Sequence, residues 1–222
     1  MRVAGSCRAT SNQERATSNK QPVTMLHRQI ILMSIFTALA VAAGQDPIPN
    51  VELVSATIFL SGVMLGAKYG LTVGAIATFL FSFFNAYGPA APPLLIAQML
   101  GMMLTGLSGG LVQNFFGPRV PPAWFLGLAG LTLTFVYDLL TTVSSIFILK
   151  TGWPGLIAAI ATGFLFFLLH QVSNTLIFAL LLPTLIRRLR QSALLQSFSP
   201  IVKTISPPEL QPSVRFTAER KP

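Results

Sequence analysis

The stretch "WFLGLAGLTLTFVYDLLTTVSSIFIL", residues 124–149, carries a single charged side chain, Asp138, in an otherwise uncharged run. About 20 apolar residues are enough for a helix to cross the hydrocarbon core of a bilayer, so this run is long enough to span it. A carboxylate at the centre of a span costs about 3 kcal/mol or more, and it normally has a partner and faces a bundle interior or a watery cavity. The stretch therefore predicts a transmembrane helix with Asp138 on its inward face.

The composition of the whole chain indicates several such helices. Of the 222 residues, 52% are hydrophobic and 9% are charged, and the mean hydropathy is +0.67. The net charge of +9 lies mostly in the two tails, because Lys68, Arg119 and Lys150 are the only basic residues between positions 29 and 186. Positive charge that flanks apolar segments is typical of membrane topology. We therefore predict a polytopic protein of the lipid bilayer and expect no nucleic acid as a partner.

Six apolar segments are separated by turns rich in Gly and Pro. We expect the membrane spans at about residues 28–45, 51–67, 69–87, 92–116, 123–149 and 155–187. The predicted fold is an all-α membrane protein with six transmembrane helices within residues 26–190. Residues 1–25 are predicted to form a disordered cytoplasmic arm, and residues 191–222 a polar cytoplasmic tail.

The distribution of basic residues predicts the orientation. With six spans, both ends of the chain lie on one side of the membrane, together with fourteen of the fifteen Lys and Arg residues. Only Lys150 then falls on the opposite side, whereas an odd number of spans would separate the two basic tails. Because Lys and Arg concentrate in cytoplasmic segments, we expect both termini in the cytoplasm.

Polar residues in or near the outer half of the predicted spans are candidates for a ligand site. Asp138 and Thr142 are four residues apart and share one face of a helix, which offers a ligand a carboxylate and a hydroxyl. An internal hydrogen bond or ion pair, with His170 as a candidate partner, explains Asp138 as well. Tyr87 and Trp153 either stack on a flat ligand or anchor the protein in the aromatic belt of the membrane interface. The candidate substrate-binding residues are Asn50, Glu52, Asn85, Tyr87, Gln98, Asp138, Thr142, Trp153, His170 and Asn174.

Few side chains are available to bind a metal ion. The chain contains one cysteine, Cys7, and two histidines, His27 and His170. A thiolate metal cluster is therefore impossible, and we expect neither a metal site nor a cofactor.

Small residues recur on one face of the first predicted span. Ser34, Ala38 and Ala42 repeat every four residues, and such a face lets another helix approach closely. The approaching helix belongs either to the same bundle or to another protein. Close helix contacts are predicted in the same way for four glycines of the fourth span, Gly101, Gly106, Gly109 and Gly110.

Three segments, taken together, resemble a known family. They are "IPNVELVSATIFLSGVMLGAKYG" (residues 48–70), "GAIATFLFSFFNAYGPAAPPLLIAQMLGMMLTGLSGG" (residues 74–110) and "YDLLTT" (residues 137–142). Over residues 28–190 the chain resembles the substrate-binding membrane subunits, or S components, of energy-coupling factor (ECF) transporters. The resemblance rests on the ordered set of segments, since no single one is a strict motif.

The resemblance implies a specific function. Such subunits have six helices and cytoplasmic termini, and they bind a vitamin or a metal ion in a cavity on the outer side. Metal-specific relatives have a His-rich amino terminus, which this chain lacks, so a small water-soluble nutrient such as a vitamin or its precursor is favoured. The resemblance also implies that Ala38 and Ala42, with Ser34 on the same face, dock against a transmembrane coupling (T) subunit that works with two cytoplasmic ATPases. The expected location is the bacterial cytoplasmic membrane.

Two alternatives come from other classes of protein. A rhomboid-like intramembrane serine protease would use Ser108 as nucleophile and His170 as base. However, Ser108 lies about 24 Å along the helix from Pro92, toward the cytoplasmic side, whereas His170 is near mid-membrane. The resemblance implies a subunit that hydrolyses nothing itself, in agreement with the absence of a P-loop, so we expect no enzymatic activity. The second alternative, a membrane scaffold or assembly protein, predicts that the polar groups satisfy one another and leave no cavity.

Overall fold

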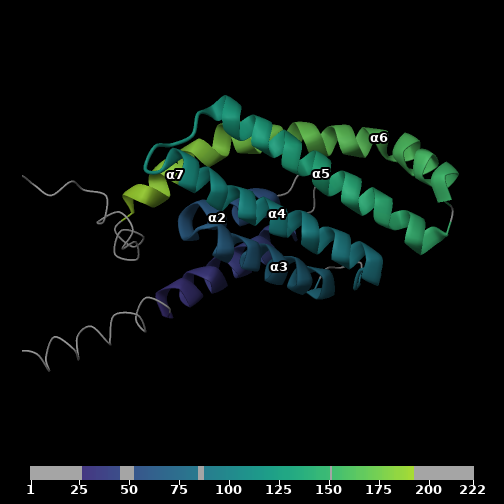
Figure 1. Ribbon diagram of the computed structural model, residues 1–222, viewed down its shortest axis with the longest axis horizontal. Helices are drawn as coiled ribbons and strands as arrows, with labels where there is room; N and C mark the ends of the chain where they lie inside the picture. The colour runs from purple at the N-terminus through teal and green to yellow at the C-terminus, as the bar shows by residue number, and fades with distance from the viewer. Residues whose placement is uncertain (1–26, 46–52, 85–87, 151, 193–222) are drawn as a thin grey trace, which may run out of the picture.

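The computed structural model describes residues 27–45, 53–84, 88–150 and 152–192, and every regular element within them is helical (Figure 1). The all-α class is thus confirmed for these residues. The predicted arm and nearly all of the predicted tail lie outside them. The elements are the helix His27–Ala43, α2 (Val54–Leu65), α3 (Ala67–Phe84), α4 (Pro92–Phe116), α5 (Ala123–Leu149), α6 (Gly152–Leu176), the π-helical turn η1 (Ile177–Leu181) and α7 (Leu182–Gln191).

Four of the described helices are long and apolar enough to cross a membrane. They are Ala67–Phe84, Pro92–Phe116, Ala123–Ile148 and the continuous helix Gly152–Gln191 that α6, η1 and α7 form. The helix His27–Ala43 and α2 are apolar but shorter. α2 has 12 residues, or about 18 Å, whereas the hydrocarbon core is about 30 Å thick. The chain is therefore a multi-pass membrane protein with four full-length candidate spans.

The turn predicted between the second and third spans is very short in the structure. A single residue, Gly66, separates the two helices, and its φ of 97° is a conformation that glycine adopts without steric cost. The Gly66 N–H donates to the Gly62 carbonyl at 2.8 Å, and the Gly66 carbonyl accepts from the Gly70 N–H at 2.9 Å. Glycine thus closes one helix and opens the next in one step, two residues before the one-residue gap between the predicted spans 51–67 and 69–87.

Glycines bring the backbones of α2, α3 and α4 into direct contact. A Cβ atom added at Gly106 would overlap the Gly70 carbonyl oxygen, and one added at Gly62 would lie 2.8 Å from the Gly110 nitrogen. Interiors packed this densely have no room for even one extra carbon atom. The close contacts predicted for the glycines of the fourth span are therefore confirmed.

A π-helical turn interrupts the last helix and ends two residues before a proline, Pro183. Pro183 lacks an N–H group, and its ring would collide with the carbonyl four residues earlier in a regular α-helix. The Leu182 N–H instead donates to the carbonyl of Ile177, five residues back, which widens the turn at this point. Phe178 in the turn is fully buried and packs edge-on against Phe59 of α2, with ring centroids 5.2 Å apart.

Arg190 holds α7 against the loop between α4 and α5. Its guanidinium donates to the carbonyls of Pro118 at 2.8 Å and Arg119 at 3.1 Å, and also to the Gln113 side chain. Arg119 and Arg190 therefore lie at the same end of the molecule. In Figure 1, α7 is at the opposite end from the turn between α5 and α6, which contains Lys150.

Candidate functional site

Two side chains of α6 bind the carboxylate of Asp138 in α5. Asp138 Oδ1 lies 2.8 Å from Nδ1 of His170, and Gln171 donates from Nε2 to Asp138 Oδ2 at 2.9 Å. The His170 and Asp138 side chains are 8% and 12% exposed. Buried charges are tolerated when they are paired and hydrogen-bonded in this way. The prediction that His170 is an internal partner of Asp138 is confirmed.

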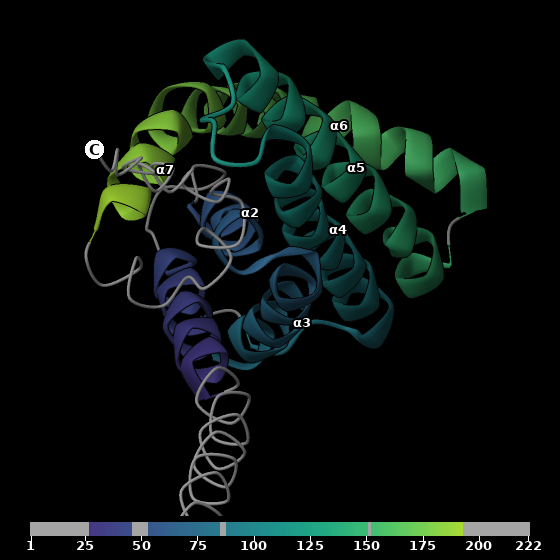
Figure 2. The same cartoon turned by 60° about the vertical axis from the view of Figure 1, so that its left-hand side comes forward.

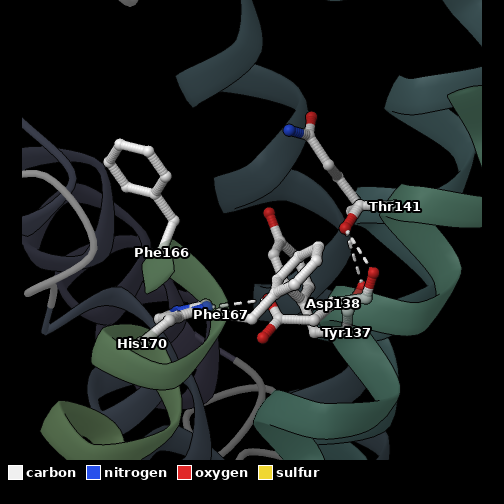
Figure 3. Close-up of a pocket in the computed structure, with 7 residues that line it drawn as sticks. Tyr137, Asp138, Thr141, Phe166, Phe167 and His170 are labelled. Atoms are coloured by element: carbon white, nitrogen blue, oxygen red, sulfur yellow. Dashed lines mark hydrogen bonds and ion pairs between the residues drawn. The ribbon is translucent and has the colours of Figure 1, made fainter. Parts of the chain in front are cut away.

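The same pair borders a cavity. The cavity has a volume of about 310 Å³ and lies between α4, α5 and α6. Figure 3 shows Asp138 and His170 pointing toward each other from α5 and α6. Pairing and cavity thus occur together, which is contrary to the expectation for a scaffold. The residues that line the cavity are Gln98, Tyr137, Asp138, Thr141, Phe166, Phe167 and His170.

Helical spacing explains how the sequence builds this lining. Tyr137 and Thr141 are four residues apart in α5, and Phe166 and His170 are four residues apart in α6, so each pair shares a helix face. Thr141 donates its hydroxyl to the carbonyls of Tyr137 and Asp138 at 3.0 and 3.1 Å, so its oxygen is left to act as an acceptor. The Tyr137 ring meets the His170 ring edge-on, at 6.2 Å and 78°.

Three of the predicted ligand residues line the cavity: Gln98, Asp138 and His170. Asn174 is fully buried one turn beyond His170 and does not line it. Trp153, in the first turn of α6, is 75% exposed and also lies outside the lining.

In α5, the structure brings Thr141 to the cavity instead of Thr142. Four further candidates, Asn50, Glu52, Asn85 and Tyr87, lie outside the described residues, so their role stays a prediction.

Aromatic residues of the lining were missed in the sequence. Phe166 and Phe167 precede His170 by four and three residues and so share its face, but they are not among the candidates predicted from the sequence. Tyr137 directly precedes Asp138. A search for aromatic residues one turn from each candidate polar residue would have found Phe166 and Phe167, but not Tyr137.

A second hollow runs between the helix His27–Ala43 and α3. Figure 2 shows this first helix, in purple, beside α3. The groove has a volume of about 640 Å³ and is mostly apolar, and Ser34, Ala38 and Ala42 line one side of it. All three small residues are exposed. Their common face is therefore not covered by the other described helices.

The alternative of a serine protease finds no support in this geometry. Gln98 of α4 lines the cavity beside His170, whereas Ser108 is ten residues further along α4 and is not part of the lining. Ten residues of helix correspond to about 15 Å, which is far beyond hydrogen-bonding reach.

These features define a class: a multi-pass helical membrane protein with a partly polar cavity between its helices, as found in solute-binding subunits of transporters. The family model "ECF-type riboflavin transporter, S component" matches residues 25–191. The chain belongs to this family, which confirms the resemblance to ECF S components. The family is a transporter component and not an enzyme. Comparisons with curated proteins and with solved structures gave no match.

Proposed function

We propose that this chain binds riboflavin on the outer side of the bacterial cytoplasmic membrane and delivers it inward with a T subunit and two ATPases. The family description, which names riboflavin, supports the choice of substrate. The observation that carries the proposal is the cavity in which a carboxylate–histidine pair lies among aromatic rings.

The chemistry of riboflavin suits this lining. Its isoalloxazine ring is flat and apolar at one edge, carries carbonyl and N–H groups at the other, and is joined to a chain of hydroxyl groups. Ligand pockets have volumes of about 300 to 1,000 Å³ and combine apolar walls with a few polar groups. The cavity of about 310 Å³ is at the lower end of this range. A single vitamin would therefore fill it.

Each polar side chain has a role in this proposal. The Gln98 carboxamide offers one donor and one acceptor group to the carbonyl and N–H edge of the ring. The Asp138 carboxylate accepts from an N–H or hydroxyl of the ligand, and Thr141 accepts from a second hydroxyl. Tyr137 and Phe167 provide ring surfaces against which the flat isoalloxazine packs.

The purified protein in detergent tests this function directly. We expect riboflavin fluorescence to be quenched on titration, with saturation at one ligand per chain, because a ring stacked on aromatic side chains loses its emission. Lumichrome, which keeps the ring but lacks the hydroxylated chain, should bind more weakly. Two results together would contradict riboflavin as the substrate. The ligand-free protein would fail to quench riboflavin fluorescence, and another vitamin would be found bound to the purified protein.

We further propose that the chain crosses the membrane six times with both termini in the cytoplasm. The gathering of Arg119 and Arg190 at the end opposite Lys150 supports this orientation. Because Cys7 is the only cysteine, a Cys7→Ser background allows single-cysteine labelling in intact cells. A membrane-impermeant maleimide should label Lys150→Cys and leave Arg188→Cys unlabelled. The reverse pattern would overturn the orientation.

The groove beside Ala38 and Ala42 is our proposed docking surface for the T subunit. Its support is the exposure of three small residues on one face, which would let a partner helix approach to backbone contact. A role inside the chain is less consistent with that exposure.

A further inference from the structure

Buried polar residues of α5 and α6 continue beyond the cavity, at Thr134 and Asn174. The two helices run antiparallel, and two contacts fix their register: Asp138 with His170, and Gly130 with Phe178. A Cβ atom at Gly130 would lie 2.7 Å from Phe178 Cβ. Halfway between these contacts, the same register puts Thr134 opposite Asn174. Both are buried, with exposed fractions of 4% and 0%.

Three buried polar atoms of α6 lack a hydrogen-bonding partner among the described residues. They are Oδ1 and Nδ2 of Asn174 and Oε1 of Gln171. A buried polar atom left unsatisfied costs about 1–3 kcal/mol. Asn174 and Gln171 are three residues apart on one helix, so their side chains are neighbours. We therefore expect one bound molecule or ion to form hydrogen bonds with all three atoms.

The chemistry of these atoms selects the occupant. Two are acceptors and one is an amide donor, so a cation would meet the N–H group and an anion would meet two oxygens. Water both donates and accepts, and a buried water molecule typically makes about three hydrogen bonds to otherwise unsatisfied groups.

We propose that ordered water lies among these three atoms and that Asn174 is a positioning residue of the ligand site. The water accepts from Asn174 and donates to Gln171 Oε1, which keeps the Gln171 Nε2 group turned toward Asp138. Asn174 thereby orients the Asp138 carboxylate without touching the ligand. The effect on ligand affinity rests on the proposed function, whereas the water site does not.

The water site is tested by a ligand-free structure of the full chain at a resolution that reveals bound water. We expect a density peak within hydrogen-bonding distance of both Asn174 and Gln171 Oε1. A dry site in which Asn174 Nδ2 donates directly to a protein carbonyl would overturn the proposal. This outcome is independent of whether riboflavin binds.

The positioning role is tested by riboflavin titration of Asn174→Leu, Gln171→Met and the double variant. Each single variant should weaken binding about tenfold, and the double variant should be no weaker than either, since both changes break one chain of contacts. Asn174→Ser, which keeps a donor and an acceptor and leaves room for a second water, should restore most of the affinity and covers the case in which Asn174→Leu fails to fold. Thr162→Val, on an exposed face of α6, is the matched control.

A double variant whose loss is the product of the two single losses would show that Asn174 does not act through Gln171. A loss of affinity that follows the loss of thermal stability across the set would assign Asn174 a purely structural role. Failure of the wild-type protein to bind riboflavin would count against the proposed function alone.

Discussion

The two halves of the molecule are packed by different means. In α2, α3 and α4, glycines let the backbones touch, and ten consecutive residues of α2, Val54 to Val63, are buried. In α5 and in the helix Gly152–Gln191, only 11% of the residues in the apolar 18-residue stretch are buried. In α3 and α4 the corresponding fractions are 33% and 39%. Figure 1 shows α5 and α6 side by side along one edge of the molecule.

This difference indicates that one half of the molecule is rigid and that the other half supplies most of the ligand site. The cavity is at the seam between the halves, with Gln98 on the closely packed side and six other lining residues on the looser α5–α6 side. In the closely packed half, the backbone contacts fix the positions of the helices, since no side chain lies between them that could rotate. Around the cavity in the other half, contacts are made by longer side chains such as Tyr137 and Phe167, which can rotate around a ligand.

The largest expected effect comes from breaking the closely packed half. Gly106→Leu should abolish the folded, monodisperse protein, because its first side-chain carbon would already overlap the Gly70 backbone. Overpacking costs typically about 1–3 kcal/mol, and more when backbone must yield. Size-exclusion chromatography and thermal unfolding measure the loss.

The control is Gly163→Ala in α6, where an added Cβ atom meets only the Phe167 ring, at 3.2 Å. A Gly106→Leu protein as stable as Gly163→Ala would show that the helices are not in backbone contact.

The next largest expected effect is a loss of ligand affinity after a change in the less closely packed half, α5 and α6. Asp138→Ala should reduce riboflavin affinity by about a hundredfold, or about 2.7 kcal/mol, because a charge-assisted hydrogen bond is lost. The folded protein should remain extractable, since Asp138 takes no part in the backbone contacts between α2, α3 and α4. Fluorescence titration measures the affinity, and Thr132→Val on the exposed face of α5 serves as the control. Unchanged affinity would remove Asp138 from the ligand site.

A third prediction separates binding from delivery. The double variant Ala38→Leu, Ala42→Leu should reduce riboflavin uptake by cells about tenfold, because bulky side chains fill the exposed groove. Binding by the purified protein should be spared, since the groove and the cavity have no lining residue in common. Equal loss of uptake and binding would count against this division of roles.

The smallest effect compares two neighbouring threonines. Thr141→Val should weaken riboflavin binding about threefold, as expected for one neutral hydrogen bond of about 0.5–1.5 kcal/mol. Thr142→Val should weaken it less, because Thr142 does not line the cavity. The same titration measures both. A larger loss for Thr142→Val would favour the face first predicted from the sequence.

Much of the fold was predictable because it depends on long apolar runs. The cores of α4 and α5 agree with the predicted spans, and the pairing of Asp138 with His170 follows from the cost of an unpaired carboxylate in lipid. The predicted spans leave a single residue, at position 68, between the second and third helices, and the apolar pattern alone could not place this joint at Gly66. The choice of Thr141 over Thr142 depends on helix rotation of about 100° per residue, which sequence spacing alone leaves open.

The joint at Gly66 also bears on how the protein enters the membrane during synthesis. α2 is too short to hold a transmembrane position alone, and Gly66 leaves it no slack relative to α3. We therefore expect the two helices to enter the bilayer as one unit, held together by the close approach of Gly62 and Gly70. A short flexible insertion at this joint should separate α2 from α3 and leave α2 unable to insert into the membrane.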